Sequence, residues 1–450
     1  MPDCFMDQNT EQNKNLLAPH KQKSQADNCI QILKNTLEKW KQGIPADRYL
    51  SGFFRENHQY GSRDRHVISE SIFAYFRWYG WILLLDPENT KPVEWAVLLA
   101  LAAEGQDLKG LYVCWCQKIG FDEQKFADIL KMEGDARIRV AAFAEVLPEN
   151  HKMLTPEQWI PAWALQEIAP EHREGFIRNL QSRPPLWLRI QKGESRDVIR
   201  QLSAETATAG IQIQAHCRNP LALMIKGGKL NLPALSLWRK GSLEVQDFSS
   251  QCIGFAAMAG SGEKWWDVCA GSGGKTLQLA KGVGAKGSVL SGDIRGYILQ
   301  ELEKRAVRGG FKQIAVEEYQ DDLPPLRHGS FDGVLVDAPC SSSGRWRRNP
   351  ESRFSLTPEQ VDQLVILQKK ILARASSAVR KGGVLVYGTC SVFERENLGV
   401  VRDFLAAHPE FKLESFPDPH TGKQTEGTLQ TLPSDADCDG SFAARFRRIR

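Results

Sequence analysis

The sequence has no long apolar run and no recognisable export signal. Among its 450 residues no stretch of about eighteen apolar residues occurs, and the segment that comes nearest, 78–85, is short and follows Arg77. The start of the chain, MPDCFMDQNTEQNKN, lacks the basic residues and the apolar segment of a secretory signal. We therefore expect no membrane span and a location in the cytoplasm.

Paired cysteine motifs and a strong net charge are also missing. The ten cysteines follow no repeated spacing, and the close pair Cys114 and Cys116 has neither a second pair nor a nearby histidine. We expect reduced thiols and no metal. The net charge of +4 does not by itself indicate nucleic-acid binding, although four arginines lie close together in one segment, 345–353.

Four stretches of different composition follow one another along the chain. Residues 1–28 are rich in Asn, Gln and Lys, which predicts a disordered lead-in. From 29 to 150 the apolar residues recur at helical spacing, so a helical domain is expected. Residues 155–245 carry short apolar strips between Gly, Pro and charged residues, as in a small α+β domain. From 246 to 450 strand-like and helical runs alternate, which is typical of a doubly wound, Rossmann-like α/β sheet.

A glycine-rich turn follows the first strand of this predicted sheet. In WWDVCAGSGGKT the strand ends at Asp267, and Gly271 and Gly273 lead into a helix. Such a turn lets a ligand approach bare backbone, so we expect a cofactor cradle. Asp293 ends the next strand, at the distance where an acid can reach ribose hydroxyls, and Asp322 follows the third strand, where an adenine edge could be contacted.

Two phosphate-binding motifs are only partly matched by this turn. A P-loop needs glycine at position 269, where the chain has Cys269, so a nucleotide-hydrolysing P-loop protein is excluded. The dinucleotide fingerprint G-x-G-x-x-G begins correctly but has Thr276 in place of its third glycine. Adenosine remains a reasonable ligand of the turn.

Two cysteines follow consecutive strands of the predicted sheet. The run FDGVLVDAP leads directly into Cys340, and GVLVYGT leads directly into Cys390. Parallel strands end at the same edge of a sheet, so both thiols are expected above the cofactor crevice. A single cysteine in such a place is usually a small buried apolar residue, but two equivalent ones point to chemistry.

Methylation at carbon 5 of a pyrimidine would use two such groups. That carbon becomes nucleophilic only after a thiolate has added to carbon 6, so covalent catalysis comes first. A base must afterwards remove the proton from carbon 5, and a second thiol is one candidate for assisting release. Asp337, three residues before Cys340, could hydrogen-bond or protonate ring nitrogen 3. Spacing alone does not say which cysteine is the nucleophile.

The segment after Cys340, SSSGRWRRNPESRF, combines arginines with Trp346 and Phe354. This composition suits phosphate contacts and base stacking, as in the binding of single-stranded or flipped-out RNA. A solvated basic loop is the alternative. The end of the chain, FAARFRRIR, predicts a last strand with a charged edge, whose arginines would either protect that edge or contact RNA.

Four segments of the C-terminal half resemble signature motifs of one enzyme family. DVCAGSGGKT, VDAPCSSSGRWRRNP, YGTCSVFERENLGVV and DGSFAARF are similar to motifs of the NOL1/NOP2/Sun family of RNA 5-methylcytosine methyltransferases. Upstream, GSRDRHVISESIFAYFRW resembles the NusB-like helical domain of the bacterial Sun branch. PPLWLRIQKG and LEVQDFSSQ resemble its small α+β domain. That branch modifies a cytosine in small-subunit ribosomal RNA.

The resemblance implies a role for each motif. Cys390 would be the nucleophile, Cys340 the release cysteine and Asp337 the group that assists at the base. S-adenosyl-L-methionine would be the cofactor and ribosomal RNA the partner. Apart from the resemblance, we expect a monomer without a metal. The residues implied to contact the cofactor are Cys269, Ala270, Gly271, Gly273, Lys275, Asp293, Asp322 and Asp337. The composition of the segment after Cys340 adds Arg345, Arg347 and Arg348 as expected RNA contacts.

Three positions depart from the family pattern. Ser342 stands where glycine is common, Gly388 where serine or alanine is common, and Ser441 where phenylalanine is usual. These changes surround intact cysteines and affect the expected substrate fit more than the expected activity. A catalytically inactive RNA-binding ribosome assembly factor with the same fold is the alternative, and the presence of both cysteines and Asp337 argues against it.

Overall fold

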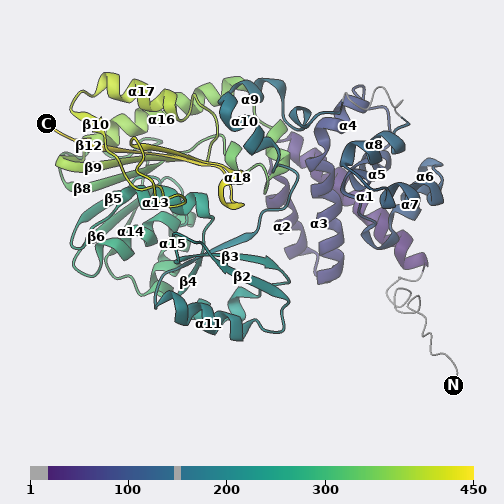
Figure 1. The fold of residues 1–450 in the computed structure, drawn as a ribbon, viewed down its shortest axis with the longest axis horizontal. Helices are drawn as coiled ribbons and strands as arrows, with labels where there is room; N and C mark the ends of the chain where they lie inside the picture. Colours follow the sequence, from purple (N-terminus) through teal and green to yellow (C-terminus); the bar gives the residue numbers. More distant parts are fainter. Residues whose placement is uncertain (1–18, 146–153) are drawn as a thin grey trace. The chain divides into compact units, whose positions relative to one another are not determined.

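The computed structural model describes residues 19–145 and 154–450, which form two compact units. The first unit comprises Met1–Ala162 together with Asn349–Ser355, and the second comprises Trp163–Arg348 and Leu356–Arg450. The chain therefore leaves the second unit after Arg348 and returns to it at Leu356. Figure 1 shows the helices and strands of both units.

The first unit is helical, as predicted. Its core contains α5, whose residues 97–102 are completely buried because the helix is apolar on every side. No helix of the described residues is both long and apolar enough to cross a membrane. The helices are α1 (Pro19–Lys41), α2 (Ala46–Glu56), α3 (Ser62–Arg77), α4 (Tyr79–Leu85), α5 (Val93–Glu104), α6 (Tyr112–Ile119), α7 (Glu123–Lys131) and α8 (Ala136–Phe143).

The start of α1 corrects one prediction. The helix begins at Pro19, whereas the composition predicted disorder from 1 to 28. Ala26 and Cys29 on this helix are almost completely buried in the core of the first unit. The burial of this apolar face offsets the conformational entropy that the segment loses when it folds. The prediction of disorder considers only the polar composition. Residues 1–18 lie outside the described part of the chain.

Residues of the arginine-rich segment also belong to the first unit. A short 3-10 helix, η7 (Pro350–Phe354), packs within it. Arg353 is completely buried and donates to the backbone oxygen of Arg77 at 3.2 Å, and the ring of Phe354 lies 5.1 Å from that of Tyr79. Phe354 and Arg353 are therefore part of a folded core, in contrast to the exposed RNA-binding loop that their composition predicted.

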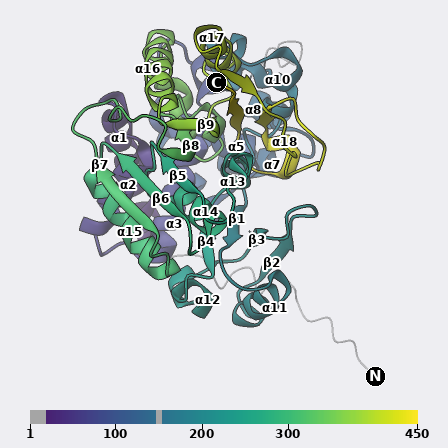
Figure 2. The same cartoon turned by 90° about the vertical axis from the view of Figure 1, so that its left-hand side faces the viewer.

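The second unit begins with a small α+β region. Its four strands are antiparallel in the order β2-β3-β1-β4, and α11 covers one face through Val198 and Leu202 (Figure 2). The small α+β fold predicted for 155–245 is present here. The elements are α9 (Ala162–Gln166), α10 (Pro170–Ile177), β1 (Leu186–Ile190), α11 (Ser195–Glu205), β2 (Ile211–Ala215), β3 (Ala222–Gly227), α12 (Ser236–Arg239) and β4 (Leu243–Val245).

A larger, mainly parallel sheet forms the rest of the second unit. Its strand order is β10-β12-β9-β8-β5-β6-β7, with β11 paired to β12. The helices α16 and α17 lie on one side and α13, α14 and α15 on the other (Figures 1 and 2). This arrangement confirms the Rossmann-like class. The strands are β5 (Lys264–Asp267), β6 (Ser288–Asp293), β7 (Ile314–Glu318), β8 (Phe331–Asp337), β9 (Val379–Thr389), β10 (Phe411–Leu413), β11 (Thr428–Thr431) and β12 (Ser441–Arg448). The helices are α13 (Phe248–Ala257), α14 (Gly274–Val283), α15 (Gly296–Gly309), α16 (Pro358–Ser376), α17 (Leu398–Ala407) and α18 (Pro433–Ala436).

The last strand is not an edge strand, contrary to the prediction. Strand β12 pairs antiparallel with β9 on one side and with β10 and β11 on the other. Arg445 and Arg447 on this strand both bind the carboxylate of Glu414 at 2.7 Å. These arginines therefore stabilise the folded unit, and edge protection is not their role.

The glycine at position 388 is required by the packing of α13. A Cβ added to Gly388 would lie 2.5 Å from Cγ2 of Ile253, a buried and β-branched side chain that has little rotamer freedom. We expect Gly388→Ala to lower the free energy of unfolding by about 1–3 kcal/mol through overpacking. Urea denaturation measures this, and Gly388→Ala combined with Ile253→Ala should lose less than the sum of the single changes. Strict additivity would contradict the steric explanation.

Candidate active site

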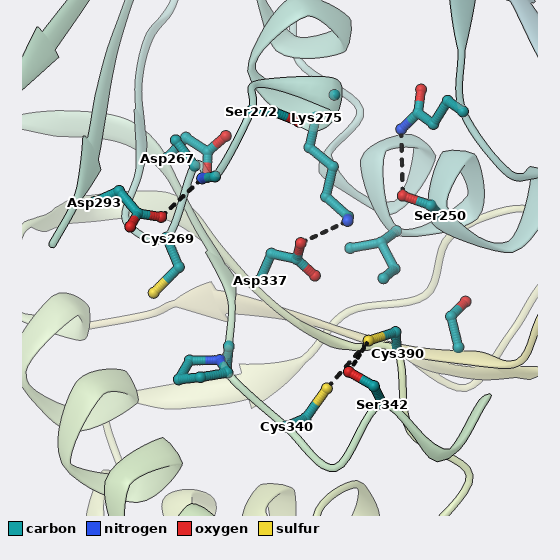
Figure 3. Close-up of a pocket in the computed structure, with 18 of the residues that line it drawn as sticks. Ser250, Asp267, Cys269, Ser272, Lys275, Asp293, Asp337, Cys340, Ser342 and Cys390 are labelled. Atoms are coloured by element: carbon teal, nitrogen blue, oxygen red, sulfur yellow. Dashed lines mark hydrogen bonds and ion pairs between the residues drawn. The ribbon is translucent and has the colours of Figure 1, made fainter. Parts of the chain in front are cut away.

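A cavity of about 790 Å³ opens at the carboxyl ends of strands β5, β6, β8 and β9 (Figure 3). Ligand pockets span roughly 300–1,000 Å³, so the cavity has room for a cofactor and part of a substrate. Within 19–145 and 154–450, no three His, Cys, Asp or Glu side chains are grouped to hold a metal ion. Predicted site residues that line the cavity are Cys269, Ala270, Gly271, Lys275, Asp293, Asp322, Asp337, Cys340, Arg345, Arg348 and Cys390.

The glycine-rich turn connects β5 to α14. Gly271 and Gly273 adopt left-handed φ angles of 51° and 87°. A Cβ on Gly271 would meet only the tip of Arg295, at 4.0 Å, so the backbone of this residue is open to a ligand. Gly273 does not line the cavity; a Cβ there would lie 2.5 Å from Cγ of Leu302. Gly271 thus matches the predicted cradle, whereas Gly273 serves close packing.

The carboxylate of Asp293 lies beside this turn. Asp293 accepts hydrogen bonds from the backbone of Gly271 at 2.9 Å and from Arg295 at 2.8 Å. Burial acts to raise the pKa of Asp293, but these hydrogen bonds and the charge of Arg295 bring it below the ordinary value. Asp293 therefore stays ionised and holds the turn against β6.

Asp267 is a site residue that the motif comparison did not single out. It is completely buried at the end of β5, and burial raises its pKa to about 7. Thr276 donates to its Oδ2 at 2.7 Å, while Oδ1 has no hydrogen-bond partner within the described part of the chain. A buried acceptor without a partner at the floor of a cavity fits a ligand that brings a donor. The turn, the open backbone and this acceptor fit an adenosyl amino acid.

The two predicted cysteines come together as expected. Strands β8 and β9 are parallel neighbours with Asp337 opposite Gly388, so Cys340 and Cys390 emerge at the same edge. Their sulfur atoms lie 3.3 Å apart, within hydrogen-bond distance (Figure 3). This contact confirms the juxtaposition predicted from the strand pattern.

The hydrogen bond between the two sulfur atoms shifts the pKa values of the two thiols in opposite directions. The hydrogen bond with Cys340, helped by the Ser342 hydroxyl and the charge of Arg345, lowers the pKa of Cys390 to about 7 against the effect of burial. The same hydrogen bond, together with burial and the charge of Glu396, raises the pKa of Cys340 well above its ordinary value. Of the two thiols, Cys390 is therefore the one that ionises first, while Cys340 keeps its proton.

A buried carboxylate joins the two cysteine loops, and the sequence analysis did not identify it. Glu396 is completely buried, and its Oε1 accepts from the backbone of Ser341 at 2.8 Å and from Gln368 at 2.9 Å. Its Oε2 accepts from the hydroxyls of Ser341 and Ser391 at 2.5 Å each. Ser341 and Ser391 directly follow Cys340 and Cys390. The only sequence signal for this role is an acid a few residues after Cys390, because its partners are far away in the chain.

Lys275 and Asp337 form an ion pair inside the cavity. The ammonium of Lys275 lies 2.6 Å from Oδ2 of Asp337, and both side chains are largely shielded from solvent (Figure 3). Because Asp337 ends β8 and Lys275 opens α14, the pair spans the space between the cofactor turn and the cysteines. The lysine thereby fixes the orientation of the Asp337 carboxyl group.

The three arginines predicted to bind RNA lie in different environments. Arg345 is exposed at the rim of the cavity. Arg347 is buried and donates to Ser182 and Asp437. Arg348 bridges the carboxylates of Asp247 and Asp439 at 2.8 and 2.7 Å.

Trp346, expected to offer a stacking surface, is instead completely buried. Its ring lies 5.6 Å from that of Phe393 and 6.2 Å from that of Phe176. The apolar ring contributes more by packing into the core of the second unit than it would in solvent. Arg345 is therefore the residue of this segment that offers an exposed charge beside the cavity.

Comparisons with known proteins give the family. Residues 258–447 match the family model for the 16S rRNA methyltransferase RsmB/F. A ribosomal RNA small subunit methyltransferase B of Klebsiella pneumoniae is 31% identical over 317 residues, covering 70% of each chain. A probable one of Bacillus subtilis is 30% identical over 318 residues, covering 68% of this chain and 70% of that protein. The match to the Sodalis glossinidius enzyme, 31% identical, covers 64% of this chain and 65% of that protein, just under two thirds of its length.

Solved structures agree on the fold. The crystal structure of PH0851 has a TM-score of 0.71 at 24% identity and covers 96% of this chain and 100% of that chain. NSun6 from Pyrococcus horikoshii has a TM-score of 0.53 at 17% identity and covers 64% of this chain and 97% of that chain. At these identities the structures support the fold alone. The sequence matches carry the assignment further: this chain belongs to the RsmB/F family of ribosomal RNA methyltransferases.

Proposed function

We propose that this protein methylates carbon 5 of a cytosine in small-subunit ribosomal RNA, with Cys390 as the nucleophile and Cys340 as the release cysteine. The observation that carries the proposal is the 3.3 Å contact between the two sulfur atoms at the mouth of the cofactor cavity. A pair of thiols that shares one proton supplies one nucleophile and one proton carrier. The names of the relatives support the ribosomal RNA substrate.

The first step is the addition of Cys390 to the base. The hydrogen bond from Cys340, together with the Ser342 hydroxyl and the charge of Arg345, lowers the pKa of this thiol, so it ionises readily and can attack without a separate base. A bond forms between its sulfur and carbon 6, and the electron pair of the C5–C6 double bond moves towards carbon 5. Asp337 accepts a hydrogen bond from the ammonium of Lys275 at 2.6 Å, so it can relay a proton from that ammonium to nitrogen 3 as the adduct forms and return it on release.

S-adenosylmethionine, when bound, supplies an electrophilic methyl group for carbon 5. Asp267 and Asp293, with the open backbone at Gly271, would hold it in the cradle. The apolar walls of the cavity and the Lys275–Asp337 pair keep the reacting atoms in one orientation.

Release requires a base near carbon 5. Once the sulfur of Cys390 is bonded to carbon 6, it no longer carries the negative charge that raises the pKa of Cys340. Cys340 can then give up its proton to water, which is the one proton that the overall methylation releases, and the resulting thiolate accepts the proton from carbon 5. The C5–C6 double bond re-forms, the sulfur–carbon bond breaks, Cys390 leaves as the thiolate, and nitrogen 3 returns its proton. Arg345, exposed at the rim, is placed to contact a phosphate of the RNA.

The proposal is tested with labelled cofactor and two RNA substrates. Purified protein is incubated with tritiated S-adenosylmethionine and with unmodified 16S ribosomal RNA, free or assembled into small subunits. We expect label in one of the two substrates and a single cytosine that resists bisulfite conversion. The Cys390→Ala variant should incorporate at least about a thousandfold less. If the wild-type protein binds both substrates but labels neither, the chain is a binding-only assembly factor.

A further inference from the structure

Ser342 combines two features that rarely occur together. Its backbone has φ 55° and ψ 24°, a left-handed conformation that disfavours any residue with a Cβ. Seven non-glycine residues of the described chain have a positive φ, and Ser342 alone among them lines the cavity. Backbone strain held at a reaction site is often part of the site's function.

The side chain of Ser342 reaches the proposed nucleophile. Its Oγ lies 3.3 Å from the sulfur of Cys390, on the loop that also carries Cys340 (Figure 3). The left-handed turn opens the short helix η6 (Ser343–Arg345) and brings the hydroxyl to this contact. A glycine would relieve the backbone strain and leave the sulfur without this partner.

We propose that Ser342 is a further catalytic residue, whose hydroxyl donates a hydrogen bond to the sulfur of Cys390 and stabilises it as the thiolate nucleophile. The inference rests on the function proposed above and deepens it. While Cys390 is a thiol it donates to the hydroxyl oxygen of Ser342. Once Cys390 is ionised the hydroxyl donates instead, and two donors, the thiol of Cys340 at 3.3 Å and the hydroxyl of Ser342 at 3.3 Å, converge on one sulfur. This arrangement is a small anion site built from a thiol and a hydroxyl.

The hydroxyl of Ser342 acts in two steps, the addition of the sulfur to carbon 6 and its elimination. When the sulfur bonds to carbon 6, it becomes a neutral thioether and its hydrogen bond with Ser342 weakens. When the sulfur–carbon bond breaks, the departing thiolate regains the hydrogen bond. The hydroxyl keeps its own proton throughout, so it aids elimination without entering the proton balance.

Other charged groups near the sulfur are left in place by a change at Ser342. Arg345 lowers the pKa of Cys390, and Asp337, which is paired with Lys275, acts to raise it. Glu396 acts on Cys340 from the buried side of the loops. A change in the titration of Cys390 in a Ser342 variant therefore reports on the hydroxyl.

The test is the pH profile of Cys390 alkylation in the full-length protein without RNA or cofactor. Iodoacetamide is used at limiting extent, and labelled peptides are quantified by mass spectrometry, with the exposed Cys217 as an internal control. Ser342→Ala removes the hydroxyl and keeps the strained backbone, whereas Ser342→Gly removes both. We expect both variants to move the midpoint up by about one pH unit, because a hydrogen bond to a charged group has about this effect.

Compared with wild type, the variants should be alkylated at Cys390 more slowly at neutral pH and faster at alkaline pH. At pH 7 the thiolate fraction falls about fivefold, but a thiolate of higher pKa is intrinsically about threefold more reactive. Alkylation of Cys390 should therefore be about twofold slower than wild type at pH 7 and two- to threefold faster at pH 9. Ser342→Gly should also melt at a higher temperature than Ser342→Ala, because it removes the strain.

Three results would overturn the inference. If the midpoint moves down, the hydroxyl accepts a hydrogen bond from the thiol and does not stabilise the thiolate. If Ser342→Ala matches wild type while Ser342→Gly shifts, backbone geometry controls the sulfur. If neither variant shifts, the contact has no effect on it. Since the assay needs neither RNA nor methyl transfer, a shifted profile in a protein that fails to methylate RNA would refute the proposed function while leaving the hydrogen bond established.

Discussion

Replacing Cys340 with alanine is expected to trap the protein on its RNA. Cys390 keeps its position at the end of β9 and can still add to carbon 6, but the thiol 3.3 Å away that would take the carbon 5 proton is gone. The adduct therefore forms and fails to resolve. Cells expressing the variant should contain a slower-migrating, nuclease-sensitive protein band on denaturing gels, and sequencing of the trapped RNA would give the methylated site.

The matched variants make this result specific. Cys390→Ala and the double variant should give no band, because neither can form the sulfur–carbon bond. Cys438→Ala is the control cysteine: it is buried outside the cavity and should behave like wild type in this assay. Trapping by Cys390→Ala, with none by Cys340→Ala, would exchange the two roles. No trapping by any variant, together with active methylation, would argue against a covalent route.

The parts of the site that sequence could predict are those set by the strand pattern. The runs before Cys340 and Cys390 are apolar and end in the same way, and parallel neighbours in a sheet end at one edge. The same rule placed Asp293 beside the turn that contains Gly271. Periodicity and strand order are local properties of the chain, so they can be recognised without knowing any long-range contact.

The parts that sequence could not predict depend on partners far apart in the chain. Arg347 and Arg348 were interpreted as RNA contacts from local composition, but Arg347 pairs with Asp437, 90 residues away, and Arg348 with Asp439, 91 residues away. Trp346 is likewise buried among residues of distant segments. A cluster of arginines and aromatic residues has the same composition in a solvated loop and in a folded core. Only the positions of the partner carboxylates distinguish the two.

Glu396 holds the two cysteine loops together, and its contribution can be measured as a change in the free energy of unfolding. Glu396→Ala removes the acceptor of four hydrogen bonds. The buried backbone N–H of Ser341 loses its acceptor, while the amide of Gln368 keeps its second one, the backbone oxygen of Pro339 at 2.9 Å. Each lost partner costs about 1–3 kcal/mol, and the serine hydroxyls regain part of this by bonding to one another, as Ser341 and Ser391 already lie 3.1 Å apart. We expect a loss of about 3–5 kcal/mol in the free energy of unfolding, measured by urea denaturation.

A control on the same loop separates the effect of this buried carboxylate from a general effect of charge. Glu394→Ala removes a carboxylate two residues away whose side chain is 45% exposed. Among the described residues it pairs with Arg402 alone, at 3.3 Å, so the change should alter stability by less than about 1 kcal/mol. If Glu396→Ala proves as mild as this control, the two cysteine loops are held by their backbone alone. A large loss would mean that one buried carboxylate keeps the sulfur atoms in contact, since it binds the residue after each of them. The geometry on which the chemistry depends would then be set by a side chain that never touches the substrate.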